Sequence, residues 1–295
     1  MIKTDQICVI DALKIGDEVE DILEKSDSRL RVHSIFEHAI NLINDSDWII
    51  TLLPEGYPAG PQAVILTQEN FARFKSLGLG AADTFDFNKL IGTKKSQIIY
   101  RRSGDKPVPE DIIKAESNNT YFESLLSQKG NKNGLLGKDN MYSRYAAPIL
   151  SEFQTLFLEQ RFDEAGEKLL GLIGLGPGLT PSGDDFVLGV FAAIYSFGMN
   201  KDIISSLKNI MAQKAKNKTN IISYNMLRQG AMGGFIEWAE DMADAVIYGD
   251  PQQIEAAFSR MLKIGSSSGS DISAGILFGI TNILALLKQK TTESH

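Results

Sequence analysis

The sequence predicts an α+β protein, with a β-rich N-terminal subdomain over residues 1–117 and an all-α subdomain over residues 141–295. Short β-branched or aromatic runs bounded by turn residues dominate the first part, which is typical of strands. From about Met141 onward, apolar residues recur at helical spacing. Between the two, residues 118–140 are rich in Asn, Gly and Lys. This stretch therefore predicts a linker or hinge.

The N-terminal subdomain contains several short strand patterns. Four runs predict strands: ICVID (7–11), WIITLLP (48–54), AVILT (63–67) and SQIIYRR (96–102). Residues 31–43 are ambiguous, because their apolar positions fit a helical stripe while RVHSIF also fits an extended strand. GYPAGP at 56–61 indicates a turn.

The C-terminal subdomain reads as a series of amphipathic or buried helices. Ala147, Leu150, Phe153, Leu156 and Phe157 form the first apolar face. Further helices are expected over 162–173, from near Asp184, and over 201–216, 220–247, 252–264 and 271–288. Glycines at 230, 233 and 234 weaken the fourth of these.

Composition narrows the possible partners and the compartment. The 295-residue chain has a formal net charge of −7, which argues against nucleic acid and anionic membrane surfaces. A single cysteine, Cys8, excludes an internal disulfide and fits a reducing cytoplasm. The apolar stretches 187–199 and 272–287 fall short of the roughly 20 residues of a membrane span. We therefore expect a cytoplasmic protein without a nucleic-acid or membrane partner, and with Cys8 in a core strand.

The segment GLGPGLTPSGDDFVLG (174–189) is the most informative motif. Its glycines allow close backbone approach to a ligand, and the following helix N-terminus favours an anion. Ser182 or Asp184 could cap that helix. A tight helix–helix connection with Asp184 as an ordinary N-cap explains one aspartate, but not the four glycines of residues 174–183 together with Asp185. The motif is neither a P-loop nor a good dinucleotide fingerprint.

We assign candidate roles within this loop by chemistry. Backbone N–H groups and the hydroxyls of Thr180 and Ser182 would bind the anion. The adjacent carboxylates of Asp184 and Asp185 suit a hard cation such as Mg²⁺. One of the carboxylates could instead act as a general base. No organic cofactor is predicted. The anion-binding candidates are Gly174, Gly176, Gly178, Thr180, Ser182 and Gly183, and the catalytic or metal-binding candidates are Asp184 and Asp185.

An internal repeat extends the site. SGDDFVLGVFAAI (182–194) aligns without gaps to SGSDISAGILFGI (268–280), with five identities in thirteen positions. A glycine inside each predicted helix indicates close helix contact, because it otherwise costs about 0.5–1 kcal/mol against alanine. GSSSGSD (265–271) is then either an exposed turn or a second anion loop facing the first. The candidates in the second loop are Ser267, Ser268, Gly269 and Asp271.

Two other segments hold weaker candidates. Within 218–234, Thr219 fits a helix N-cap, Ser223 lies one turn later, and Arg228 could bind a carboxylate or phosphate. A capped surface helix explains the same residues. His33 and His38 are the internal histidines, and no Cys/His cluster has zinc-ligand spacing.

At these motifs the chain resembles the AllH-type subunit of oxamate carbamoyltransferase, a bacterial family long known only as a domain of unknown function. GLGPGLTPSGDDFVLG carries the resemblance, supported by TNIISYNML (219–227) and SSGSDISAGI (267–276). VHSIFEHAIN (32–41), which adds His33 and Asn41 as substrate candidates, is similar to the N-terminal pattern. The resemblance implies two partner subunits, one similar to acyl-CoA synthetases. It also implies conversion of oxalurate and phosphate into oxamate and carbamoyl phosphate during anaerobic allantoin breakdown.

Three functions therefore stand as hypotheses. The first is a subunit of a carbamoyl-transferring complex that binds a small anionic substrate at helix N-termini. The second is a stand-alone Mg²⁺-dependent nucleotide or phosphate enzyme on a helical scaffold. The third is a non-catalytic scaffold subunit.

Overall fold

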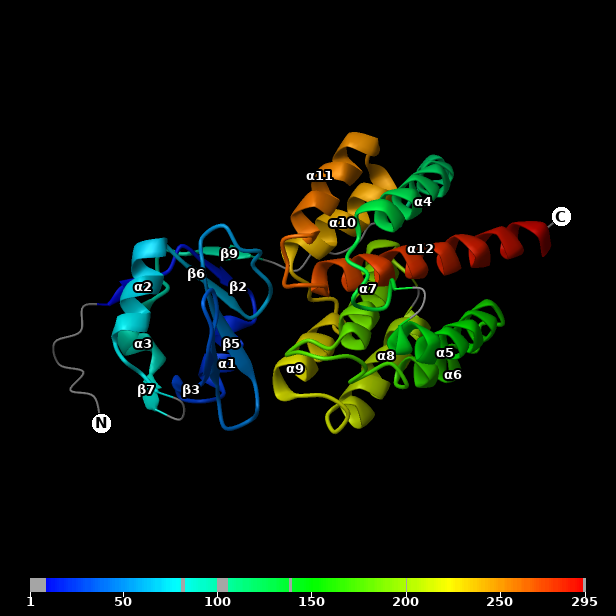
Figure 1. Ribbon diagram of the computed structural model, residues 1–295. Coiled ribbons are helices and arrows are strands. Elements are labelled where there is room, and N and C mark those ends of the chain that lie inside the picture. The colour runs from blue at the N-terminus through cyan, green and yellow to red at the C-terminus, as the bar shows by residue number, and fades with distance from the viewer. Residues whose placement is uncertain (1–8, 81–82, 100–105, 138–139, 200, 294–295) are drawn as a thin grey trace. The chain divides into compact units, whose positions relative to one another are not determined.

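The computed structural model describes residues 9–80, 83–99, 106–137, 140–199 and 201–293. The chain divides into two compact units, Met1–Arg101 and Arg102–His295, called unit 1 and unit 2 below. Unit 1 contains every described strand, and the described elements of unit 2 are helical (Figure 1). The predicted α+β fold class is confirmed.

Unit 1 is built on a mixed seven-stranded sheet. Its strand order is β7-β3-β4-β5-β6-β2-β9, and a separate parallel pair joins β1 to β8. Within the large sheet β5–β6 and β2–β9 are parallel, and the other neighbours are antiparallel. The strands are β1 (Ile10–Asp11), β2 (Lys14–Gly16), β3 (Arg29–Ile35), β4 (Ile40–Ile43), β5 (Ile49–Pro54), β6 (Ala63–Leu66), β7 (Thr84–Asp86), β8 (Ile91–Gly92) and β9 (Gln97–Ile99).

Alternate residues of these strands form the core of unit 1. Leu30, Val32, Leu42 and Leu52 belong to one buried cluster with side chains from three helices. The helices are α1 (Val19–Glu24), α2 (Gln68–Ser76) and α3 (Phe87–Leu90). The opposite face of the sheet carries a smaller apolar cluster around Ala63 and Ile65, together with polar residues such as Asn41.

The strand predictions hold where the structure describes them. Runs 48–54 and 63–67 correspond to β5 and β6. Residues 31–43 form no helix but two antiparallel strands, β3 and β4, with a β-bulge between Val32 and Ser34. Of the outer runs, only the β1 and β9 portions lie in the described residues. Cys8 lies outside them, so its predicted core position stays a prediction.

Unit 2 consists of helices, whose amphipathic faces form a second core. They are α4 (Pro109–Lys129), α5 (Met141–Leu158), α6 (Phe162–Leu169), α7 (Ser182–Ser196), α8 (Lys201–Ile210), α9 (Ile221–Gly230), α10 (Glu237–Tyr248), α11 (Pro251–Met261) and α12 (Ser268–Glu293). One π-helical turn, Met211–Ala215, follows α8.

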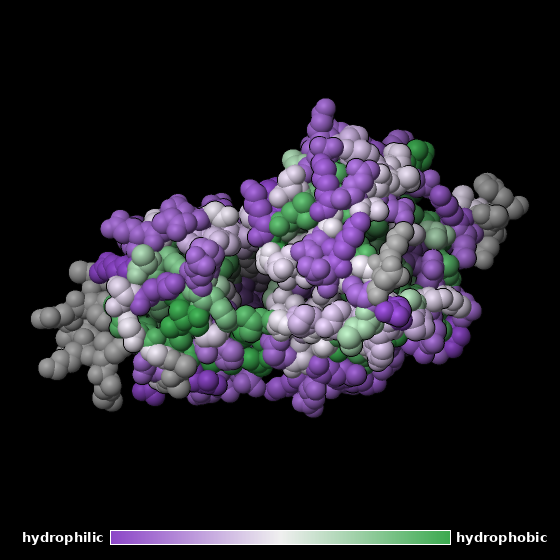
Figure 2. Space-filling model, in the orientation of Figure 1, coloured by the Kyte–Doolittle hydropathy of each residue, from purple (hydrophilic) through white to green (hydrophobic). Residues whose placement is uncertain are grey.

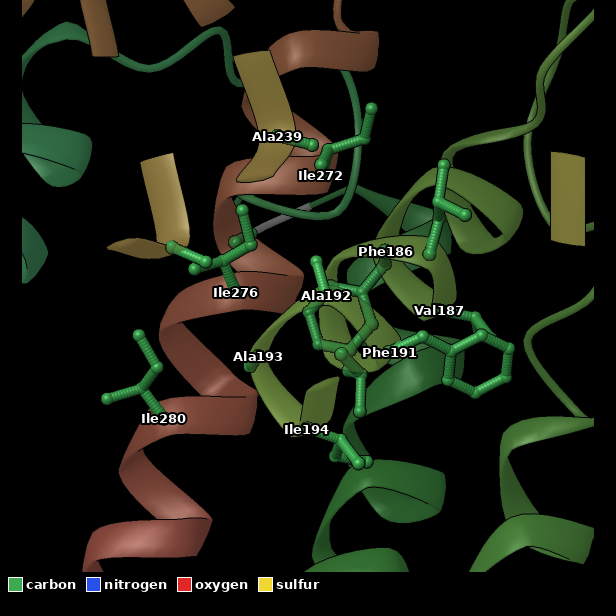
Figure 3. Packing of buried hydrophobic residues seen from close by; sticks show 14 of the residues in the cluster. Phe186, Val187, Phe191, Ala192, Ala193, Ile194, Ala239, Ile272, Ile276 and Ile280 are labelled. Carbon is green, nitrogen blue, oxygen red and sulfur yellow. The ribbon is translucent and has the colours of Figure 1, made fainter. Parts of the chain in front are cut away.

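Helices α7 and α12 form the centre of this core and run in the same direction (Figure 3). A Cβ atom on Gly189 would lie 2.0 Å from the Ile272 carbonyl oxygen, and one on Gly275 would lie 2.0 Å from that of Phe186. The glycine in each copy of the repeat therefore permits backbone contact between the two helices, as the sequence predicts. Because the helices are parallel, their N-termini lie at the same end.

Helix α12 contains one stretch, Ser268–Thr291, that is long and apolar enough to cross a membrane by length and composition. It exceeds the 272–287 stretch that we judged too short. In this fold 72% of its apolar window is buried inside the protein. Its hydrophobicity is thus accounted for by its place in the core, next to α7 (Figure 3).

The division between the units differs from the predicted linker at 118–140. The compact units meet at Arg101 and Arg102, and α4 continues to Lys129 within unit 2. Its buried Phe122, Leu125 and Leu126 join the core, although polar residues around them read as linker. Asn131, Gly134 and Leu135 of the predicted linker contact the site described below.

Some predicted helices end earlier or divide. The segment 220–247 forms α9 and α10 separately, because Gly233 takes a positive φ of 84° that ends helical geometry. The segment 162–173 is helical only to Leu169. Pro251 starts α11 after Asp250, which accepts from the Gln253 amide as expected for an N-cap.

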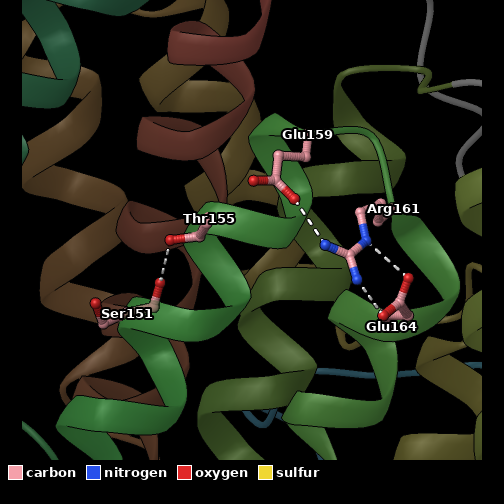
Figure 4. A network of polar contacts seen from close by, with 5 residues as sticks. All are labelled: Ser151, Thr155, Glu159, Arg161 and Glu164. Atoms are coloured by element: carbon pink, nitrogen blue, oxygen red, sulfur yellow. Dashed lines mark hydrogen bonds and ion pairs between the residues drawn. The ribbon is translucent and has the colours of Figure 1, made fainter.

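The surface of unit 2 carries mainly hydrophilic residues on the face shown in Figure 2. One example is Arg161, whose guanidinium pairs with Glu159 at 2.9 Å and with Glu164 on the next turn (Figure 4). Exposed ion pairs of this kind contribute little to stability. Unit 2 is thus held together chiefly by its buried helix contacts.

Candidate functional site

The N-termini of α7 and α12 bring the two glycine- and serine-rich loops together. The Thr180 hydroxyl of the first loop lies 3.0 Å from the Ser268 hydroxyl at the start of α12. These two side chains are half-buried, while Asp185 and Asp271 beneath them are buried. Two helix N-termini side by side place two positive dipole ends at one location.

The two loops share one backbone scaffold. In the first, the Leu175 amide donates to Leu172, and the Gly183 amide donates back to the Leu175 carbonyl. In the second, the Ile264 amide donates to the Met261 carbonyl, and the Gly269 amide donates back to the Ile264 carbonyl. Eight positions separate Leu175 from Gly183, but five separate Ile264 from Gly269, so the first loop has three additional residues.

The aspartates of the repeat contact serines on the opposite helix. The Asp185 carboxyl group of α7 lies beside the Ser268 hydroxyl of α12, and the Asp271 carboxyl group of α12 lies beside the Ser182 hydroxyl of α7; each hydroxyl opposes the rise in the pKa of its neighbouring carboxyl group. Thr180 is a further neighbour of Asp185. We call these two contacts, Asp185 with Ser268 and Asp271 with Ser182, the crossed pair. Because equivalent residues exchange partners, the arrangement has approximate two-fold symmetry.

The carboxyl groups of the crossed pair are harder to ionise than an ordinary aspartate. Burial raises the pKa of Asp271, and it raises the pKa of Asp185 well above its ordinary value, with the Asp271 charge adding to the second effect. Oδ2 of each aspartate is buried and accepts no hydrogen bond within the described part of the chain. A buried polar atom of this kind costs free energy unless a proton or a cation satisfies it.

Both carboxylate oxygens of Asp184 accept hydrogen bonds from the protein, and its predicted catalytic or metal-binding role stays a prediction. Its Oδ1 accepts from the Gly174 amide at 2.6 Å, and its Oδ2 accepts from the hydroxyls of Ser223, at 2.6 Å, and Thr219. Burial raises its pKa, although these three donors oppose the shift. Asp184 therefore anchors the glycine loop to the start of α9.

Both predicted helix caps are wrong. Residue Pro181 occupies the N-cap of α7 and provides no side-chain cap, so neither Ser182 nor Asp184 fills that place. Asn220, not Thr219, caps α9 by accepting from the Ile222 and Ser223 amides. The hydroxyls and the carboxylate that sequence reasoning took for caps are used for contacts between segments instead.

A third segment, missed by sequence reasoning, lines the second loop. The Leu135 amide donates to Asp271 Oδ1 at 2.8 Å, and the Asn131 amide donates to Ser270 Oγ at 2.9 Å. A Cβ atom on Gly134 would lie 2.2 Å from Asp271 Oδ2. The Gly-rich part of the expected hinge is therefore held against the site, and Gly134 is required by the close approach.

The backbone donors differ from those predicted. The Gly174 and Gly183 amides are used within the protein, by Asp184 and by the Leu175 carbonyl. Across the described residues, the amides of Gly176 and Gly178 donate to no backbone oxygen, and neither does that of Ser267. These three amides are among the loop groups that remain available to an anion.

The oxygen donors also suit a hard cation. Mg²⁺ takes carboxylate oxygens and keeps several waters, so one or two aspartates can hold it. The unpartnered Oδ2 atoms of Asp185 and Asp271 are of the required type. No group of three or more His, Cys, Asp or Glu among the described residues is placed to hold a metal ion. A Mg²⁺ ion held by Asp185 and Asp271 alone therefore stays a prediction.

The remaining candidates make contacts within their own units. Arg228 donates to Asn225 at 2.7 Å and lies over the Tyr224 ring, on its own helix α9. His33 and Asn41 belong to β3 and β4 of unit 1, where both contact Ser34. The predicted site residues thus fall into two groups by their contacts. One group is the crossed pair and Asp184 in unit 2, and the other is His33 and Asn41 in unit 1.

The fold and site define an α+β protein with a helical unit that gathers serine, threonine and aspartate side chains at two paired helix N-termini. Comparison with protein families identifies it further. Residues 172–280 match the model described as oxamate carbamoyltransferase subunit AllH, and residues 11–102 match the AllH family N-terminal domain. The chain belongs to the AllH family of oxamate carbamoyltransferase subunits. No solved structure matches it.

Proposed function

We propose that this chain helps a subunit complex to transfer a carbamoyl group from oxalurate to phosphate, releasing oxamate and carbamoyl phosphate. In this proposal the chain binds the small anion where α7 and α12 begin. The crossed pair is the observation that carries it, because two equivalent helix N-termini there present hydroxyl groups above buried carboxyl groups. The family membership supports the reaction class.

The hydroxyl groups, amide groups and helix dipoles at the two loops all suit a negatively charged ligand. The hydroxyls of Thr180 and Ser268 would turn from Asp185 and from each other toward a phosphate or carboxylate, and would join the amides of Gly176, Gly178 and Ser267 as hydrogen-bond donors to it. The two helix dipoles favour the same negative charge. The first loop and the second loop would then each contribute to one anion.

The buried aspartates would oppose that anion if both were ionised without a counter-charge. Their raised pKa values favour protonation, which removes the repulsion. A Mg²⁺ ion on Asp185 and Asp271 would have the same effect and would itself attract phosphate. With Mg²⁺ bound, Oδ2 of each aspartate would also acquire a partner.

Titration calorimetry of the full chain tests this binding. Phosphate and carbamoyl phosphate are each added with and without Mg²⁺. Ser268→Ala, which removes one donor and one contact of Asp185, should weaken binding about tenfold, since a hydrogen bond to a charged group contributes about 1.5 kcal/mol or more. Ser117→Ala, which removes an exposed hydroxyl on α4, is the matched control. The absence of binding by wild type under all four conditions would reject the proposed anion site.

Activity with the partner subunits separates a catalytic from a scaffolding role. Asp185→Asn and Asp271→Asn keep the side-chain shape while removing the carboxylate. We expect both to reduce carbamoyl phosphate formation by the reconstituted complex. Full activity in both variants, with normal assembly, would instead favour a scaffold subunit. Mg²⁺-dependent nucleotide binding by the chain alone would favour a stand-alone phosphate enzyme.

A further inference from the structure

Unit 1 holds a polar row that the proposed anion site does not use. Ser34, Asn41 and Thr51 are direct neighbours across β3, β4 and β5, because Ser34 pairs with Asn41 and Asn41 pairs with Thr51. They lie on the face of the sheet opposite Val32 and Leu42, which belong to the core. Asn41 is buried, whereas Ser34 and Thr51 are half-buried.

The β-bulge in β3 brings a histidine to this row. Val32 pairs with Leu42 and Ser34 with Asn41, so His33 is the additional residue of the bulge. Adjacent side chains of a regular strand point to opposite faces, and a bulge changes their direction. Here His33 Nδ1 lies 3.1 Å from Ser34 Oγ.

The hydrogen bonds fix the direction of the protons along the row. Thr51 Oγ1 donates to Asn41 Oδ1 at 2.9 Å, because an amide oxygen can only accept. Asn41 Nδ2 then donates to Ser34 Oγ at 3.0 Å. The Ser34 proton is left to point at His33 Nδ1, which accepts it when the second ring nitrogen carries the hydrogen.

The protonation state of the imidazole agrees with this direction. Partial burial and the nearby Arg31 charge lower the pKa of His33, so the ring is neutral at pH 7 and Nδ1 can accept. A serine hydroxyl that donates to a neutral histidine is the arrangement by which a weak nucleophile is activated.

We propose that Ser34 and His33 form a nucleophile–base pair, so that unit 1 carries a reactive site of its own for small compounds with an activated carbonyl group. Ser34 Oγ forms a bond to the carbonyl carbon while its proton moves to His33 Nδ1. The bond to the leaving group breaks, and the leaving group takes that proton. Water then attacks the acyl-serine, transfers a proton through His33 and restores the Ser34 hydroxyl. The inference does not depend on the proposed anion site.

Labelling with a fluorophosphonate tests the pair, because the phosphorus of this probe stands in for the carbonyl carbon and fluoride is its leaving group. The full chain is incubated with the probe and the modified peptide is found by mass spectrometry. We expect the label on Ser34 and none on Ser34→Ala. His33→Gln retains the nucleophile and should label about a hundredfold more slowly, the usual contribution of a general base.

Matched variants keep the result interpretable. His38→Gln changes an exposed histidine on the turn after β3, which stacks on Tyr57, and should label at the wild-type rate. Circular dichroism shows whether each variant is folded. Folded wild type without label on Ser34, or His33→Gln labelling as fast as wild type, would overturn the proposal. Slow labelling confined to His33→Gln supports it even if Ser34→Ala does not fold.

Discussion

The loops that precede α7 and α12 have equivalent backbone hydrogen bonds, but they differ in the contacts made by the third residue of the following helix. In the first loop this residue is Asp184, which accepts from Gly174, Thr219 and Ser223. In the second it is Ser270, which accepts only from the Asn131 amide among its described contacts. The fourth helical residue, in contrast, is an aspartate in both.

This difference separates two roles that the Asp-Asp sequence merges. The shared position, Asp185 and Asp271, reaches across to the other helix and keeps one buried oxygen unpartnered in the described structure. The third helical residue, Asp184 in α7 and Ser270 in α12, instead holds a neighbouring segment of the chain against its own loop. We therefore infer that ligand chemistry belongs to the shared aspartates and that Asp184 belongs to stability.

The largest expected effect comes from breaking the contact on which the symmetry depends. Gly189→Ala and Gly275→Ala each place a methyl group about 2.0 Å from a carbonyl oxygen of the opposite helix. Since backbone must move, each change should lower the free energy of unfolding by about 3 kcal/mol. Urea denaturation of both variants measures whether the two halves respond equally.

The control for this change is Gly80→Ala in unit 1. Its added methyl would meet Asp83 at 3.6 Å, an ordinary van der Waals distance, without a positive φ. We expect a change below about 1 kcal/mol there. A similar small change at Gly189 would mean that the helices can separate freely, and would contradict the close contact.

The difference between Asp184 and Ser270, the residues at the third helical position, should be smaller, about 2 kcal/mol. Asp184→Ala leaves the buried Ser223 hydroxyl and two further donors without their acceptor, so it should lower the free energy of unfolding by about 3 kcal/mol. Ser270→Ala removes one hydrogen bond and should cost about 1 kcal/mol. Equal losses in denaturation experiments would remove the proposed asymmetry between the loops.

The sequence predicts the paired part of this site well. Five identities at one spacing indicate that 182–194 and 268–280 are equivalent, and the two glycines within them indicate a close helix contact. Both signals are local and regular, so they can be read without knowing the fold. The convergence of the two loops follows from the parallel direction of the helices.

The anchors could not be predicted in the same way. Thr219 and Ser223 lie 35 and 39 positions from Asp184, and Asn131 lies 139 positions from Ser270. Spacing gives no sign of such contacts, and the Asn- and Gly-rich composition around Asn131 is typical of a linker. Strands of two or three residues, such as β8 and β2, are also too short to show a period.

The smallest effect concerns protonation of the shared aspartates. A raised pKa means that the folded state holds the proton more tightly than the unfolded chain. Between the ordinary carboxyl pKa and the raised value, the free energy of unfolding therefore falls as pH rises, by at most about 1.4 kcal/mol per pH unit for each group. Below that window, both states are protonated and the slope disappears.

Asparagine variants show how much each aspartate contributes to the change in the free energy of unfolding with pH. Asp185→Asn should flatten the fall more than Asp271→Asn, because the pKa of Asp185 is raised further. Asp271→Asn also removes the charge that helps to raise it, so each variant should weaken the effect of the other. Thermal unfolding with a chelator present, from pH 4 to pH 8, measures the slopes. Identical slopes in wild type and both variants would show that these carboxyl groups ionise as easily in the folded chain as in the unfolded one.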